Sequence, residues 1–153
     1  MTKKEVVAFA FQHPDSGQVN KPQCNFHDTV MKSVARVTGF EKLRYFFYGG
    51  AIRGGKTYVC LFILIQLARI FPRSRWHIFR SDFPELEDTT IPSMEKLLGV
   101  EGKDFIWKRK SSNYHVLFAN GSKIFFKSEN LMKDPELKWM LGLETNGIFL
   151  EQM

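Results

Sequence analysis

The stretch Gly50-Ala51-Ile52-Arg53-Gly54-Gly55-Lys56-Thr57 decides the expected fold, because it satisfies the pattern G-x-x-x-x-G-K-[ST]. Its glycines allow backbone N–H groups to turn inward and hold phosphate oxygens. Lys56 would reach the β- and γ-phosphates as a point charge, and Thr57 would offer its hydroxyl to Mg²⁺. The pattern therefore predicts a loop that binds the phosphates of a nucleotide through residues 50–57.

The residues on either side supply the context that such a loop requires, a strand before it and a helix after it. Residues 44–48 (RYFFY) form an aromatic run that predicts a buried strand. Residues 56–71 are apolar almost all round and stop at Pro72, which predicts a helix packed against a sheet. The N-terminus of this helix would direct its dipole toward a bound anion.

Further along the chain, strands alternate with helical patterns. Strands are predicted at residues 76–79, 105–108, 115–118, 123–127 and 147–150. A helix is expected over residues 83–99, with a break at Pro92, and Asn120-Gly121 predicts a hairpin turn. A short helix is expected from Asp134-Pro135 to Gly142. This order predicts an α/β fold with a mainly parallel central sheet.

The N-terminal part has a different character, so the chain is divided into residues 1–42 and a core over residues 43–153. Residues 13–25 are polar and turn-rich and are expected to form an irregular arm. A short helix follows, with Asp28 as its cap and Gly39 as its stop. The chain ends at Met153, directly after a predicted core strand, so we expect a piece of a longer protein whose sheet is incomplete at the C-terminus.

The amino-acid composition limits the classes of function that this chain can have. The net charge is +6 and the pI about 9.4, which fits either a polyanionic partner or a solvated basic surface. Residues 101–127 hold six bases against Glu101 and Asp104. Two cysteines, Cys24 and Cys60, are too few for a disulfide scaffold or a zinc site. The sequence shows neither a secretory signal nor a stretch long enough to span a membrane.

A phosphate-binding loop needs a second site that carries a carboxylate, and residues 147–151 (GIFLE) are the best candidate. In one interpretation Glu151 holds Mg²⁺ on the metal side and Gln152 occupies the catalytic position, where an amide orients water but cannot take its proton. In a shifted interpretation Glu151 is the catalytic acid and Leu150 stands on the metal side. A third interpretation is a strand end with an incidental acid.

Three basic positions are further candidates. Arg53 lies within the loop and could contact the γ-phosphate or stabilise transition-state charge, or it could only shape the loop. Arg80 could sense the nucleotide or form a structural salt bridge. Lys108-Arg109-Lys110 could touch DNA phosphates, although a solvated strand end explains these residues as well.

The residues from Tyr48 to Thr57 resemble the Walker A region of phage terminase large subunits, which often carry an Arg among the variable positions. Upstream, Lys21-Pro22-Gln23 with Phe26-His27 resembles the adenine-recognition element of that family, in which a Gln reads the base. Downstream, weaker similarities follow in the family's order: Arg80 with Leu86 and Ser93, Asn120-Gly121-Ser122-Lys123-Ile124, and Leu141-Gly142-Leu143-Glu144 before the apolar strand. The resemblance covers about residues 20–153.

This resemblance implies a P-loop NTPase of the three-layer sandwich type, with ATP and Mg²⁺ as cofactors and Gln23 on the base. It implies an ATPase motor that moves double-stranded DNA into a procapsid. The expected partners are a portal protein, a small terminase subunit and further copies in a ring, in the cytoplasm of a bacterial host. Gln152 departs from the family pattern, which has an acid there. Another P-loop ATPase, a kinase, or a nucleotide-binding fragment without catalysis remains an alternative.

Overall fold

A computed structural model describes residues 17–35, 45–49, 55–110, 113–128, 138 and 142–151. The chain divides into two compact units, residues 1–63 and residues 64–153. The boundary falls within helix α3 (Lys56–Ile70). In the described part of the chain, no helix is both long and apolar enough to cross a membrane.

The first unit contains helix α2 (Lys21–Ala35) and the beginning of α3. Asn20 caps α2, because its side chain accepts a hydrogen bond from the backbone N–H of Gln23 at 3.3 Å. Pro22 occupies the first turn, where a missing N–H costs nothing. Gln23, His27 and Val30 are the buried residues of α2, spaced for one helix face.

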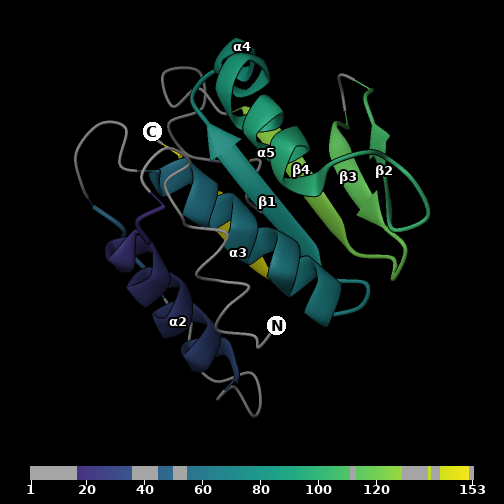
Figure 1. Ribbon diagram of the computed structural model, residues 1–153. Coiled ribbons are helices and arrows are strands. Elements are labelled where there is room, and N and C mark those ends of the chain that lie inside the picture. Colours follow the sequence, from purple (N-terminus) through teal and green to yellow (C-terminus); the bar gives the residue numbers. More distant parts are fainter. Residues whose placement is uncertain are drawn as a thin grey trace. The chain divides into compact units, whose positions relative to one another are not determined.

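The second unit is built on a five-stranded sheet of order β2-β3-β4-β1-β5 (Figure 1). Its strands are β1 (Arg75–Arg80), β2 (Phe105–Lys108), β3 (His115–Phe118), β4 (Lys123–Ser128) and β5 (Gly147–Leu150). β1 pairs in parallel with both β4 and β5, whereas β2, β3 and β4 are antiparallel neighbours. The α/β class and the parallel centre are therefore confirmed, within a sheet that is mixed.

A helical segment covers one face of this sheet (Figure 1). It consists of α4 (Phe83–Glu85), the π-helical turn η1 (Leu86–Thr90) and α5 (Ile91–Leu98). Phe83 packs edge-on against Tyr114 at 5.9 Å, and Tyr114 meets Phe126 of β4 at the same separation. Ile78 and Ile124 are fully buried on this face, as is Leu86 in the helical segment above. The core of the second unit lies between the two layers.

The hairpin between β3 and β4 also closes the C-terminal end of α3. Gly121 has φ 83°, a conformation that favours glycine, and Asn120 precedes it. The Asn120 amide donates to the carbonyls of Ala68 at 2.8 Å and Arg69 at 3.1 Å. These carbonyls belong to the last turn of α3, where no backbone partner is available. The predicted Asn-Gly turn is confirmed, and it acts as a helix cap as well.

One predicted element is wrong. Residues 45–48 of the predicted RYFFY strand have no strand structure, and Tyr45 and Phe47 are 71% and 90% exposed. Aromatic residues favour strands because they pack on a pleated, half-buried surface beside another strand. Nothing in the described part of the chain pairs with this run. These aromatic residues therefore lack the neighbouring strand on which their preference for strand structure depends.

The first helix begins earlier than its sequence pattern indicates. α2 starts at Lys21, so residues 21–25 are helical rather than part of an irregular arm. The cap is Asn20 and not Asp28, which lies inside the helix beside His27 at 3.3 Å. The apolar pattern after Asp28 predicts a helix start at that residue. The polar residues before Asp28 nevertheless form a capped first helical turn, in which Gln23 is buried.

The break expected at Pro92 is replaced by a wider turn before it. At the C-terminal end of η1, the Ile91 N–H donates to the carbonyl of Leu86, five residues back. Pro92 follows as the second residue of α5, where no N–H is needed. A π-turn leaves room for a proline ring that would clash with a regular helix. The short helix expected near Asp134-Pro135 lies outside the described residues.

Candidate functional site

The end of the predicted phosphate-binding loop lies at the start of α3. Gly55 has φ 67°, and Lys56 and Thr57 are the first two residues of the helix. The Gly55 carbonyl accepts the first helical hydrogen bond, from the N–H of Val59 at 3.1 Å. The N-terminus of a helix favours an anion through its dipole and the direction of its backbone N–H groups. Lys56 and Thr57 are both half-buried there.

Gln23 lies against this same segment of the first unit. Its side-chain amide nitrogen donates to the Gly55 carbonyl at 2.8 Å, and the residue is only 6% exposed. A Cβ added at Gly55 would lie 2.1 Å from that nitrogen, so any side chain at this position would displace the Gln23 amide. The structure thus brings together Gln23 and Gly55, two predicted nucleotide-binding residues that lie 32 positions apart.

Two ring contacts join α2 to its neighbours within the first unit. Phe26 lies 4.6 Å from the ring of Tyr48, the residue that precedes Gly49-Gly50. His27, which is 2% exposed, lies 5.8 Å from the ring of Phe62 on α3. One side of α2 therefore contacts the segment before the predicted loop, the end of that loop and the helix after it.

Glu151 forms the other candidate site, in the second unit. It follows β5, and its N–H donates to the carbonyl of Phe79 at 2.9 Å, which continues the parallel pairing with β1. Its side chain is buried and accepts a hydrogen bond from the Thr90 hydroxyl at 2.5 Å. Arg80, at the end of β1, lies 3.7 Å from the same carboxylate oxygen.

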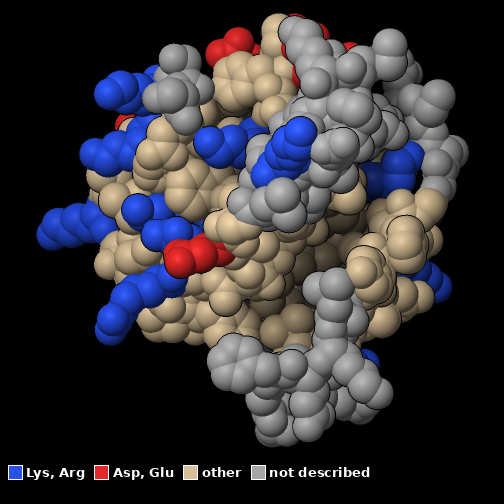
Figure 2. Space-filling view, turned by 180° about the vertical axis from the view of Figure 1, so that it is seen from behind, with Lys and Arg blue, Asp and Glu red and all other residues tan. Residues whose placement is uncertain are grey.

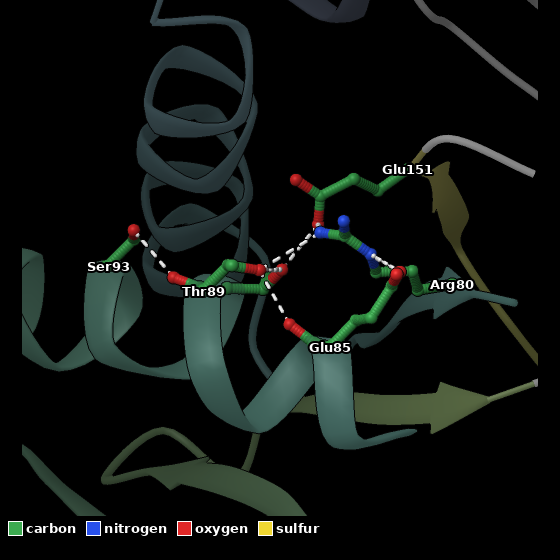
Figure 3. A network of polar contacts seen from close by, with 6 residues as sticks. Arg80, Glu85, Thr89, Ser93 and Glu151 are labelled. Atoms are coloured by element: carbon green, nitrogen blue, oxygen red, sulfur yellow. Dashed lines mark hydrogen bonds and ion pairs between the residues drawn. The ribbon is translucent and has the colours of Figure 1, made fainter. Parts of the chain in front are cut away.

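The other side of Arg80 is bound to the helical segment. Its Nε donates to Glu85 at 2.7 Å, and an outer nitrogen donates to the Thr89 hydroxyl at 2.9 Å (Figure 3). The Arg80 side chain is 12% exposed. Arg80 therefore has the salt bridges of a structural residue, in line with one of its two sequence interpretations. A carboxylate held by a hydroxyl and a guanidinium offers the oxygen chemistry that Mg²⁺ prefers.

The face of the sheet opposite the helical segment is rich in cations. Cross-strand partners project to the same face, and the register pairs Arg75 with Lys123, and Phe79 with Lys127. Lys108 is paired with His115 on the β2–β3 side. In the view from behind, Lys and Arg side chains gather on one side of the surface (Figure 2).

Two buried histidines, His77 and His115, lie among the cationic residues on this face of the sheet. His115, Phe125 and His77 are neighbours across β3, β4 and β1, with ring separations of 5.0 and 4.8 Å. Burial, and then the charges of Lys127 and Arg75, lower the pKa of His77 to about 4. Burial also lowers the pKa of His115, and nearby lysines add to that effect. Both rings are thus neutral at pH 7, and the charge of the face comes from its Lys and Arg residues.

Of the predicted DNA-contact residues, Arg109 interacts with two side chains of the protein itself. It pairs with Glu95 at 3.0 Å and lies 5.4 Å from the centre of the Trp107 ring. Lys108 and Lys110 are exposed. The cationic face therefore depends on residues that the basic tripeptide did not indicate, mainly Lys123 and Lys127. The alternation in residues 123–127 (KIFFK) could have revealed them, because it places both lysines on one side of a strand.

Several predicted residues lie outside the described part of the chain: residues 50–54 of the loop, with Arg53 among them, and Gln152. Lys56 belongs to the first unit and Glu151 to the second. Among the described residues, no three or more His, Cys, Asp or Glu side chains gather as a metal site would require. Sequence reasoning missed Thr90, because a threonine in a helical stretch gives no sign of a distant carboxylate partner.

In comparisons with known proteins, no family model, no curated protein and no solved structure matches this chain.

Proposed function

We propose that this chain is the ATP-binding part of a viral DNA-packaging motor of the terminase large-subunit type. The observation that carries the proposal is the pattern G-x-x-x-x-G-K-[ST] at residues 50–57, with Lys56 and Thr57 opening α3. Gly55 adopts a left-handed conformation that favours glycine, and it is the kind of residue that a phosphate loop uses. The mixed α/β sheet is compatible with a P-loop three-layer sandwich.

In this proposal, ATP is bound by the first unit. Lys56 neutralises the β- and γ-phosphates, Thr57 binds Mg²⁺ through its hydroxyl, and backbone N–H groups of residues 50–57 hold phosphate oxygens. Arg53 contacts the γ-phosphate, and Gln23 lies near the base. Mg²⁺ supplies charge neutralisation at the transferred phosphoryl group when it is bound.

Glu151 is the metal-side acid of the proposed mechanism, acting on Mg²⁺ through water. Its buried carboxylate, held by Thr90 and Arg80, supports this role because its orientation is set before any ligand arrives. Gln152 would orient the attacking water without accepting its proton. The shifted interpretation, with Glu151 as the catalytic acid, predicts a different response to substitution of Gln152.

Double-stranded DNA is the proposed polymer substrate, and the cationic face of the sheet supports a polyanionic partner. A portal protein, a small terminase subunit and a ring of identical copies complete the proposed assembly, in the cytoplasm of an infected bacterium. These partners follow from the resemblance of the motifs and not from any contact in the structure.

The test of nucleotide binding is calorimetry with Mg-ATP on the wild type, Lys56→Ala and Lys96→Ala. Charge-assisted contacts contribute about 1.5–3 kcal/mol, so Lys56→Ala should weaken binding at least about tenfold. Lys96 is exposed on α5, and its removal should leave affinity unchanged. Equal affinity in all three proteins would exclude residues 50–57 as the phosphate site.

Gln152 favours a second candidate function, a nucleotide-binding protein with little catalysis of its own. Single-turnover hydrolysis of Mg-ATP by the wild type should be slow, and Gln152→Glu should raise it if position 152 activates water. A fast wild type that Gln152→Glu does not alter would favour Glu151 as the catalytic acid. Turnover stimulated by double-stranded DNA, and not by small phosphate acceptors, would separate a motor from a kinase.

A further inference from the structure

Helix α2 contacts the chain on both sides of the predicted phosphate-binding loop. Gln23 donates its amide to the carbonyl of Gly55, near the end of the loop, at 2.8 Å. Phe26 packs on Tyr48, two residues before Gly50, with ring centres 4.6 Å apart. Gln23 and Phe26 are three positions apart on a helix, so they share one side of it. A single helix turn thus holds the chain at both ends of the loop.

We propose that this turn of α2 is a clamp that orients the peptide group between Gly55 and Lys56, at the end of the predicted phosphate-binding loop, with Gln23 as a positioning residue for phosphate rather than only a reader of the base. The inference rests on the proposed nucleotide-binding function and adds to it a role for Gln23 that does not involve the base. Gln23, Phe26, Tyr48 and Gly55 are its members, and all four lie in the first unit.

The physical reason lies in the peptide group between Gly55 and Lys56. A trans peptide is planar, so its C=O and N–H point in opposite directions. The Gly55 carbonyl accepts from two donors, the Val59 N–H at 3.1 Å and the Gln23 amide at 2.8 Å, and these occupy both of its lone pairs. With the carbonyl held on one side, the Lys56 N–H is directed to the other, away from the helix body and toward an incoming anion.

Gly55 and Gln23 also depend on each other sterically. Gly55 takes φ 67°, and a Cβ at this position would meet the Gln23 amide nitrogen at 2.1 Å. Gln23 is buried, so its amide replaces water as the partner of the Gly55 carbonyl. Loss of the amide would leave that carbonyl with only its helical donor, and the peptide plane would be less well fixed.

The two roles of Gln23 predict different responses to a ligand without a base. If Gln23 only reads adenine, its removal weakens ATP and leaves inorganic tripolyphosphate unaffected. If it positions the loop, both ligands weaken by the same factor. A hydrogen bond between neutral groups contributes about 0.5–1.5 kcal/mol, so the expected loss is about two- to twelvefold for each ligand.

The experiment compares the wild type with Gln23→Ala, Gln23→Met and Asn25→Ala. Gln23→Met keeps the length of the side chain and removes its donor. Asn25→Ala removes a carboxamide from an exposed position of the same helix and is the matched control. Affinities for Mg-ATP and for Mg-tripolyphosphate are measured by calorimetry. Hydrogen exchange of the backbone amides in residues 55–60 is measured without any ligand.

The expected result is an equal loss of both affinities and faster exchange in residues 55–60 for the two Gln23 variants, with no change for Asn25→Ala. Tripolyphosphate affinity that stays at the wild-type value while ATP affinity falls would overturn the proposal and leave Gln23 as a base reader. If the wild type binds neither ligand, the proposed function fails, and exchange alone decides: acceleration supports the clamp and unchanged exchange overturns it.

Discussion

Replacing Thr90 by Val tests how the Glu151 carboxylate is held. Thr90 is fully buried, and its hydroxyl donates to Glu151 at 2.5 Å across 61 positions of the chain. Val has nearly the same shape, so Thr90→Val removes the donor without opening a cavity. Glu151 would then keep Arg80, at 3.7 Å, as its remaining charged partner in this network.

The expected cost follows from the charge and the burial of the acceptor. Hydrogen bonds to charged groups contribute about 1.5–3 kcal/mol, and a buried carboxylate cannot replace the lost donor with water. We therefore expect Thr90→Val to lower the free energy of unfolding by about 1.5–3 kcal/mol. Thr90→Ser keeps the hydroxyl and loses one methyl group, at a cost of about 0.8 kcal/mol.

The assay is urea denaturation followed by tryptophan fluorescence, with Trp76 and Trp107 buried in the same unit. A double-mutant cycle with Glu151→Gln isolates the pair, because a neutral acceptor makes a weaker bond. Thr90→Val should cost less in the Glu151→Gln background. A loss below about 0.5 kcal/mol, or the same loss in both backgrounds, would show that this hydrogen bond does not hold the carboxylate in place.

Two further predictions concern the cationic face of the sheet. Burial first, and then Lys127 and Arg75, lower the pKa of His77 from 6.5 to about 4, so the folded state binds fewer protons than the unfolded state. Its contribution to stability is complete above pH 6.5 and is lost as the pH falls toward 4, by at most about 3 kcal/mol. Urea denaturation at pH 7 and pH 4.5 should show a smaller pH effect for His77→Phe, and an equal effect would contradict this. Lys123→Glu with Lys127→Glu should weaken binding to double-stranded DNA and reduce the salt slope by about 0.9 for each lost phosphate contact. Fluorescence anisotropy across a salt series measures this, with Lys96→Glu as the control, and an unaltered slope would exclude this face.

Local patterns predicted much of the second unit. The expected strands at Phe105–Lys108, His115–Phe118 and Gly147–Leu150 match the structure, and the helix expected over residues 56–71 is α3, Lys56–Ile70. These elements were predictable because alternation, apolar runs and turn residues act within a few positions of the chain. Gly121 and Pro72 mark their ends for the same reason.

The predictions of secondary structure failed where a specific contact with another residue or strand decides the local conformation. The RYFFY run has the composition of a strand, yet its described residues pair with no other strand, and Tyr45, Phe46 and Phe47 are exposed. α2 begins at Lys21 because the Asn20 side chain accepts a hydrogen bond from the N–H of Gln23, whereas the apolar pattern starts only after Asp28. The π-turn of η1 adapts the helical segment to Pro92, an adjustment that no propensity indicates.

The candidate sites also depend partly on local sequence patterns and partly on contacts that form only in the folded chain. The sequence alone determined which residues have the chemistry for a nucleotide: the glycines, Lys56 and Thr57 at the required spacing, and an acid after an apolar strand. Only the tertiary structure decided that Gln23 bonds to Gly55 and that Thr90 and Arg80 hold Glu151. Periodicity and motif spacing report on neighbours along the chain. Contacts across 32 or 61 residues depend on how the segments between them fold and close.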